Sequence, residues 1–336
     1  MPISTIGDIQ QHFLSSRNTS SMKSELNTLV QELTTGQASD LTSHLGVSQS
    51  ELSSLDRQLQ MLARFNQSNT ETGQLLSTMQ IALDNIEQHR ADAGGTLLII
   101  SDSSTLSQIS DAGRVALSGF EATVQSLNMR SAGRSMFGGA DLDSNPLAPP
   151  GDMIDALKTT VAGLTDVGDI TTAIDTWFDV AGGGFDTIGY QGDAAGFVQR
   201  PIDASQNVEI QIRADDDTLK DTLKALALGA LAGDTDLALS TQSRQTLQQQ
   251  AAEDLFSVAA PLASVQGRLG YAEGQVEEAS VRNSAQEASF GIARNTLVSA
   301  DPFETATRLE AVQLQLETHY TLIARLSRLS LTEYLR

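Results

Sequence analysis

The stretch that decides the fold runs from Leu255 to Leu297 and reads LFSVAAPLASVQGRLGYAEGQVEEASVRNSAQEASFGIARNTL. Most residues at every seventh position are apolar, and so are most residues three positions after them. The first series is Leu255, Leu262, Leu269, Val276, Asn283, Phe290 and Leu297, and the second is Val258, Val265, Ala272, Ala279, Gln286 and Ala293. This repeat is the a/d pattern of a coiled-coil seam.

Three residues interrupt the pattern. Asn283 and Gln286 are polar at seam positions, and we expect them to fix the register against a partner helix. Pro261 predicts a kink or a helix start. An antiparallel hairpin inside a monomeric bundle would bury the same residues, so the stripe is compatible with a monomer and with an assembly.

A second long helix is predicted from about Ser48, and it supplies a partner for this seam. Its apolar residues recur at helical spacing until Gly94-Gly95, where we expect the helix to break. A third helix is expected from about Ser104 to Arg130. The predicted intramolecular seam consists of Leu52, Leu55, Leu59, Leu62, Leu255, Val258, Leu262, Val265, Leu269, Ala272, Val276, Ala279, Phe290 and Leu297.

The two ends of the chain predict further helices. The first ends at Gly36, a C-cap glycine, and residues 35–46 form a connector. The last helix starts at Asp301-Pro302. Their apolar residues have little chain of their own to cover them, so we expect packing between subunits. These residues are Ile6, Ile9, Phe13, Leu26, Leu29, Leu33, Leu309, Val312, Leu316, Ile323, Leu326, Leu331, Tyr334 and Leu335.

The composition changes at Met136, where glycine and proline become frequent. Gly182-Gly183-Gly184 predicts a loop and Val208–Arg213 a strand, between short helices at residues 152–164, 170–180 and 218–231. We therefore predict a mainly α fold. Its N- and C-terminal parts form a long antiparallel helical bundle or coiled coil, into which a small α/β (strand-containing) outer domain is inserted.

The predicted domains follow from this layout. Residues 1–40 and 300–336 are the terminal helices, 41–138 and 243–299 a helical rod, and 139–242 the inserted domain.

The charge of the chain restricts its partners. Its 336 residues carry 42 acidic and 21 basic side chains, a formal net charge of -21. No basic cluster exists for nucleic acid or for an anionic membrane, so neither is an expected partner. The N-terminus has no secretory signal pattern, and the longest apolar run, Leu97–Ile100, is too short for a membrane span. We expect a cytoplasmic protein, or one that leaves the cell without a cleaved signal.

No catalytic or cofactor motif stands out. The chain has no cysteine, and its histidines at 12, 44, 89 and 319 are isolated from one another in the sequence. Asp215-Asp216-Asp217 could attract calcium, but it lacks the spacing of a calcium loop and fits a helix N-terminus better. We predict no enzyme, no metal and no cofactor.

Several segments resemble the flagellin superfamily, and within it the hook-associated protein 3 branch at the hook–filament junction. They are Leu26–Asp40 with Glu32-Leu33-Thr34-Thr35-Gly36, Gly133–Asp141 followed by Pro146-Leu147, Tyr190–Asp193 followed by Arg200-Pro201-Ile202, and Ala311–Leu335 ending in Leu329–Leu335. The connector after Gly36 and the terminal Tyr334 depart from filament flagellin, which favours the junction branch.

The resemblance implies a structural subunit that self-assembles through its terminal helices, which are disordered in the free subunit and order on assembly. It implies type III export without a cleaved signal. The implied partners are copies of the chain, hook-associated protein 1, flagellin and an export chaperone. The alternatives are a flagellin that forms the filament itself and a cytoplasmic coiled-coil scaffold.

Overall fold

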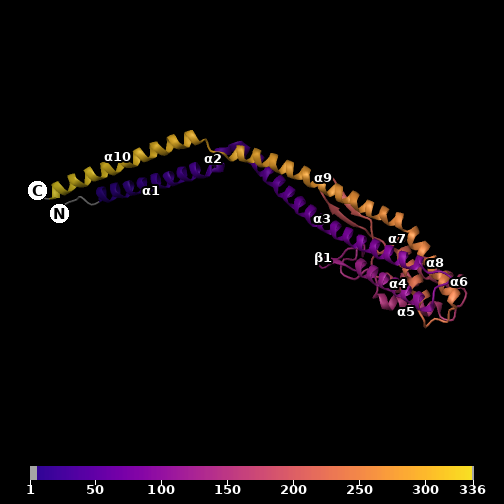
Figure 1. Cartoon of the computed structure of the whole chain (residues 1–336). Helices are drawn as coiled ribbons and strands as arrows, with labels where there is room; N and C mark the ends of the chain where they lie inside the picture. Colours follow the sequence, from indigo (N-terminus) through magenta and orange to yellow (C-terminus); the bar gives the residue numbers. More distant parts are fainter. Residues whose placement is uncertain (1–5, 335–336) are drawn as a thin grey trace. The chain divides into compact units, whose positions relative to one another are not determined.

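The protein is described by a computed structural model that covers the backbone of residues 6–334 and the side chains of residue 10 and residues 12–325. Helices dominate it (Figure 1). The α-helices are α1 (Ile6–Thr35), α2 (Leu41–Leu45), α3 (Gln49–Leu98), α4 (Leu106–Leu127), α5 (Pro150–Val161), α6 (Val167–Asp179), α7 (Asp217–Gly233), α8 (Thr241–Ser257), α9 (Ala259–Val298) and α10 (Pro302–Tyr334). The predicted mainly α fold is confirmed.

The strands form two small antiparallel hairpins. Strand β1 (Arg130–Ser131) pairs with β2 (Arg134–Ser135), and β3 (Val198–Pro201) pairs with β4 (Asn207–Ile210). A 3₁₀ turn covers Gly46–Ser48 and a π turn covers Phe185–Gly189. The predicted connector at residues 35–46 therefore contains a short helix, and the predicted strand at Val208–Arg213 ends three residues early.

The chain forms two compact units. The first contains Met1–Ala63 and Ala285–Arg336, and the second contains Arg64–Ser284. These boundaries differ from the predicted domains. The segment predicted as an insertion, residues 139–242, shares one apolar core with α4, α8 and the parts of α3 and α9 that belong to the second unit.

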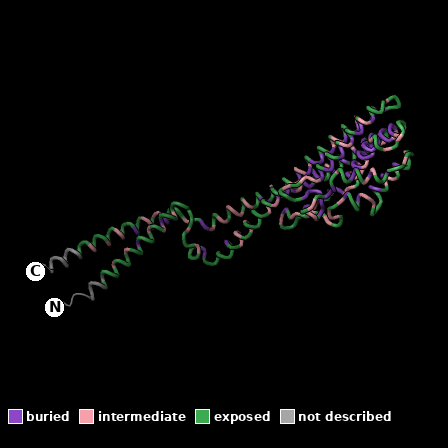
Figure 2. Tube along the Cα trace, turned by 90° about the horizontal axis from the view of Figure 1, so that it is seen from below, coloured by how far each residue is buried: buried purple, intermediate pink, exposed green. Residues whose placement is uncertain are grey.

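Helix α7 is the centre of the second unit. From Leu223 to Gly233 almost every residue is buried, on all sides of the helix. A helix that is apolar all round must be covered all round, and α4 and α8 provide most of this cover. The buried residues of the chain accordingly gather in this unit (Figure 2).

Helices α4 and α7 cross at two glycines. A Cβ atom on Gly113 would lie 2.5 Å from the Cα atom of Gly233, which no real contact permits. The crossing therefore requires glycine at both positions, and it lets the two backbones approach closely.

Polar side chains of α8 hold the connection between α3 and α4. The amides of Gln245, Gln248 and Gln249 donate to the carbonyl oxygens of Ser104, Ile109 and Ile100. These three bonds tie the loop between α3 and α4, at Ile100 and Ser104, and the first turn of α4, at Ile109, to α8.

The predicted break at Gly94-Gly95 is wrong, because α3 continues to Leu98. Gly94 faces α8, where an added Cβ would lie 3.4 Å from the Cβ of Leu255. Two helical glycines cost about 1 kcal/mol each relative to alanine. Burial of the adjacent Ala93 and Leu97, both inaccessible to solvent, offsets this cost.

Pro261 marks a helix start, as predicted. Helix α8 ends at Ser257 and α9 begins at Ala259, so the proline falls in the first turn of α9. Its missing N–H is not needed at this position.

We predict that Gly113→Ala destabilises the second unit by about 1 to 3 kcal/mol, because the new methyl group would overlap the backbone of α7. Trp177 is buried in this unit, so its fluorescence during urea unfolding reports the change. Gly95→Ala is the matched control. It lies in α3 with nothing within 4 Å of the added Cβ, and it should not destabilise the protein. Equal stability of the two variants would contradict the packing argument.

Candidate functional site

Helices α1 and α10 pack against each other as an antiparallel pair in the first unit (Figure 1). The Oγ atom of Ser15 lies 3.3 Å from Nε2 of His319, and Glu25 faces Arg308 at 3.8 Å. Lys23 lies over the ring of Tyr320, 5.8 Å from its centroid. These contacts align the start of one helix with the end of the other.

The chain closes this pair with a short backbone bridge. The N–H of Ala38 donates to the carbonyl oxygen of Val298 at 2.9 Å, and the N–H of Ala300 donates to Gly36 at 3.1 Å. Gly36 has a φ of +69°, which favours glycine and ends α1 as predicted. Beside this bridge lies a small apolar cluster, formed by Leu41, Leu45, Leu52, Leu297 and Val298.

Helix α10 begins as the Asp301-Pro302 signal predicts. The Oδ1 atom of Asp301 accepts from the N–H groups of Phe303 and Glu304 at 2.8 and 3.2 Å. This is an N-cap followed by proline at the first helical position.

The pair buries little of its apolar surface. Buried apolar residues among the described side chains of α1 and α10 are Met22, Leu29 and Val312. Most of the pair is solvent-accessible (Figure 2), and large apolar side chains are exposed along both helices. The exposed apolar residues are Phe13, Leu14, Val30, Leu33, Phe303, Leu314, Tyr320 and Leu322.

The predicted assembly residues fall into four groups. Leu29 and Val312 are buried between the chain's own helices and are not available to a second subunit in this structure. Phe13 and Leu33 are exposed, and the half-buried residues are Leu26, Leu309, Leu316 and Ile323. Leu335 and the side chains of Ile6, Ile9, Leu326, Leu331 and Tyr334 lie outside the described residues.

The predicted seam residues occupy both units. In the second unit α9 lies beside α3, and Gln266 donates to Asp84 across the two helices at 2.9 Å. The seam residues buried there are Leu255, Val258, Leu262, Val265, Leu269, Ala272, Val276 and Ala279. In the first unit Leu52 and Leu62 are buried, and Leu55, Leu59, Phe290 and Leu297 are half-buried. Arg294 and Asp56 form an ion pair there at 2.7 Å.

The expectation for the two polar seam positions needs correction. Asn283 is buried, but its amide donates to the carbonyl oxygen of Ile202, in the β3–β4 turn, at 2.9 Å. Asn69 of α3 donates to the same oxygen at 3.1 Å. The two amides clamp the hairpin and do not pair with each other. Gln286 is exposed.

Sequence reasoning missed Asn69, although a signal for it exists. The seven-residue step from Leu62 passes through Asn69 and continues along α3, at Leu76, Leu83, Arg90 and Leu97. All of these positions are buried. The asparagine in each helix's stripe marks the point where that helix meets the hairpin.

Two of the resemblance segments meet in the second unit. The N–H of Asp193 donates to the carbonyl oxygen of Gly138 at 2.9 Å, and that of Gln191 donates to Pro146 at 2.8 Å. Gly139 has a φ of +68°, and a Cβ there would lie 2.3 Å from the carbonyl oxygen of Asp193. The glycines of one segment are thus required for the approach of the other.

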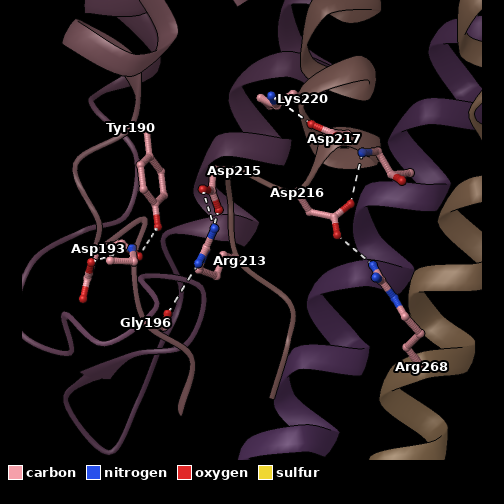
Figure 3. A network of polar contacts seen from close by, with 11 residues as sticks. Tyr190, Asp193, Gly196, Arg213, Asp215, Asp216, Asp217, Lys220 and Arg268 are labelled. Atoms are coloured by element: carbon pink, nitrogen blue, oxygen red, sulfur yellow. Dashed lines mark hydrogen bonds and ion pairs between the residues drawn. The ribbon is translucent and has the colours of Figure 1, made fainter. Parts of the chain in front are cut away.

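A polar network extends from this junction (Figure 3). The hydroxyl of Tyr190 donates to the carbonyl oxygen of Asp193, and Arg213 forms two hydrogen bonds with Asp215. Burial raises the pKa of Tyr190, so the phenol stays protonated. The hydrogen bond to Asp215 raises the pKa of Arg213.

The three consecutive aspartates have separate structural partners. Asp216 caps α7 by accepting from the N–H of Thr218, and it also pairs with Arg268 at 2.7 Å (Figure 3). Asp215 pairs with Arg213, and Asp217 pairs with Lys220. The N-cap prediction is confirmed.

The described residues contain no group of three or more His, Asp or Glu side chains that could hold a metal ion. No helix among them is long and apolar enough to cross a membrane.

The family model of the bacterial flagellin C-terminal helical region matches residues 255–335. This segment is similar to that region. It comprises the end of α8, α9 and α10, the helices that carry the heptad stripe and half of the terminal pair. The predicted flagellin resemblance is therefore confirmed for this segment.

One solved structure supports the fold. One match is a candidate flagellar hook-associated protein from Vibrio parahaemolyticus, with a TM-score of 0.53 and 12% identity over 76% of this chain and 99% of that chain. The crystal structure of Bacillus cereus FlgL has a TM-score of 0.43 and 14% identity over 73% of this chain and 96% of that chain. No curated protein matches the sequence.

We predict that Asn283→Ala loosens the β3–β4 hairpin, because the Ile202 carbonyl keeps only one of its two donors. A lost hydrogen bond of this kind costs about 1 to 2 kcal/mol. Hydrogen exchange of the amides in residues 198–210 should become faster. Gln286→Ala removes an exposed amide from the same stripe and should leave this exchange unchanged. Unchanged exchange in Asn283→Ala would show that the clamp does not hold the hairpin.

Proposed function

We propose that the chain is a structural subunit of the bacterial flagellum that joins the hook to the filament. The observation that carries the proposal is the flagellin C-terminal helical region at residues 255–335. Its last helix, α10, exposes apolar side chains that a soluble monomer would normally cover. Assembly with copies of the chain would bury them.

The position at the junction is inferred from the sequence motifs of the chain. The order of the resemblance segments favours the hook-associated protein 3 branch, and so does the terminal Tyr334. The neighbours at such a position are hook-associated protein 1 on one side and flagellin on the other. We further infer an export chaperone for the C-terminal helix and type III export without a cleaved signal. A filament-forming flagellin is the second candidate, because it would share the C-terminal region.

The terminal helices are proposed to order fully only on assembly. In α1 and α10 few described side chains are buried, whereas nearly all of α7 from Leu223 is buried. Helix formation in water depends on tertiary packing, because isolated helices are marginal. The ordering cost of the terminal helices would be met by burial against neighbouring subunits.

We predict that amides of residues 10–35 and 302–325 exchange quickly in the free chain at micromolar concentration, while those of α7 are strongly protected. Hydrogen-exchange mass spectrometry measures both regions in one sample, so α7 serves as the internal control. Protection of the terminal helices equal to that of α7 would contradict assembly-dependent order.

We predict that Leu314→Ser combined with Leu322→Ser abolishes attachment of filaments to hooks. Both side chains are exposed, at 66% and 52%, so the change should leave the free fold intact and remove apolar contact area from an interface. The double variant replaces the native gene in the source bacterium. Swimming and electron microscopy of hooks give the readout, and detection of the chain in the medium shows that export continues.

Val281→Ser is the matched control for this experiment, because Val281 is equally exposed, at 60%, on α9 of the second unit. Cells with this change should swim. Normal filaments on hooks in the double-variant strain would overturn the proposed interface. Growth of long filaments from the purified wild-type chain on seeding would favour the filament subunit over the junction subunit.

A further inference from the structure

A cavity of about 360 Å³ lies in the second unit, between α3 and the two β-hairpins. Its apolar wall includes Leu75 of α3, Met136, Ile210 at the end of β4, and Ile212, which follows that strand. Its polar wall is formed by Arg134 and Ser135 of β2, Arg200 of β3, and Glu71 and Gln74 of α3. The resemblance segments at residues 133–141 and 200–202 thus both contribute to this wall.

Hydrogen-bond donors in this wall lack partners. Ser135 is 4% exposed, and its hydroxyl has no hydrogen-bond partner among the described residues. The Nε atom of Arg200 is buried and likewise has none. Leaving such groups unpaired costs about 1 to 3 kcal/mol each. Both residues line the cavity, so two donors without partners among the described residues lie in its wall.

The charges at the cavity favour an anion. Arg134 stands exposed at the wall and forms no ion pair with any residue that the structure describes. With Arg200 it gives two positive charges against the single negative charge of Glu71, in a chain whose net charge is -21. The nearby Arg213 is already paired with Asp215 at 2.8 Å. The two guanidinium groups without ion-pair partners among the described residues therefore give the cavity a net positive charge.

The apolar wall restricts the kind of anion. A guanidinium group binds a carboxylate through two parallel hydrogen bonds. The apolar side of the cavity would contact an aliphatic chain, whereas a phosphate with a sugar would leave its polar groups unpaired there. We propose that this cavity binds a carboxylate carried on a short apolar stem.

The frame around the cavity is rigid. The N–H of Ser135 donates to the carbonyl oxygen of Leu142 at 2.8 Å, and the N–H of Ala214 donates to Phe137 at 2.9 Å. Arg200 is held in register opposite Val208 in the β3–β4 hairpin. Fixed backbone positions lower the entropic cost of binding. The site does not depend on the proposed role in the flagellum.

The carboxylate has two possible sources, a free aliphatic acid or an acidic side chain beside an apolar residue in a second copy of the chain. Both present the same chemistry to Arg134, Ser135 and Arg200.

Titration calorimetry with the full chain tests the site, with hexanoate as the probe and hexanamide as its uncharged isostere. Hexanoate should bind and hexanamide should bind at least about tenfold more weakly, because a charge-assisted pair is lost. Arg200→Met and Arg134→Met should each weaken hexanoate binding by about tenfold. Glu71→Gln should strengthen it, since a repulsive charge is removed.

Arg64→Met is the matched control, because Arg64 is an exposed arginine of α3 outside the cavity wall. It makes the same change in net charge and should leave binding within about twofold of wild type. Arg134 is exposed, so Arg134→Met keeps the test valid if Arg200→Met fails to fold, and Trp177 fluorescence reports folding. Equal binding of hexanoate and hexanamide, or unchanged binding in a folded Arg134→Met variant, would overturn the proposal.

Sedimentation of the full chain separates the two sources. If hexanoate and Arg134→Met both reduce self-association, the carboxylate comes from a second copy. If self-association is the same with and without hexanoate while calorimetry shows binding, the ligand is a free acid.

Discussion

The apolar stripe of α9 can leave water only if another helix lies beside it. From Leu262 to Ala279 the seam positions of α9 are buried in a core to which α3 also contributes. Each large aliphatic side chain buried in this way stabilises the fold by about 1.5 to 3 kcal/mol. The pairing of two helices that are distant in the sequence is therefore the constraint on which the second unit depends.

This constraint explains how the middle of the chain is held. The stripes of α3 and α9 each contain one asparagine, and both amides bind the carbonyl oxygen of Ile202. The β3–β4 hairpin, which carries this carbonyl, also contributes Arg200 to the cavity wall, and β2 contributes Arg134. Each asparagine interrupts the apolar seam of its helix, but its amide holds the β3–β4 turn in place. Buried polar groups often have this role in proteins.

The two units show opposite balances of burial and exposure. In the second unit α7 is surrounded by other helices, whereas α1 and α10 have mainly each other. A pair of helices cannot cover its own apolar residues on every side, so Phe303 and Leu314 face solvent. In the proposed assembly subunit, the well-packed second unit and the high negative charge would favour a soluble free chain. The exposed apolar residues of α1 and α10 would then gain burial from neighbouring subunits.

The sequence by itself determined the helices and their apolar faces. Heptad spacing, the Asp301-Pro302 signal and Gly36 were sufficient for α1, α9 and α10, because these features act within one or two turns of a helix. It also showed the flagellin resemblance and its order of motifs. Only the tertiary structure decided which distant residues act at one place. Asn69 and Asn283 bind the same carbonyl oxygen, Asp193 donates to Gly138, and Arg134 and Arg200 line one cavity. The two members of each pair are more than fifty residues apart in the sequence. Such contacts depend on how whole elements pack, which no local spacing encodes. The continuation of α3 through Gly94-Gly95 has the same cause, since helix propensity disfavours it and packing against α8 stabilises it.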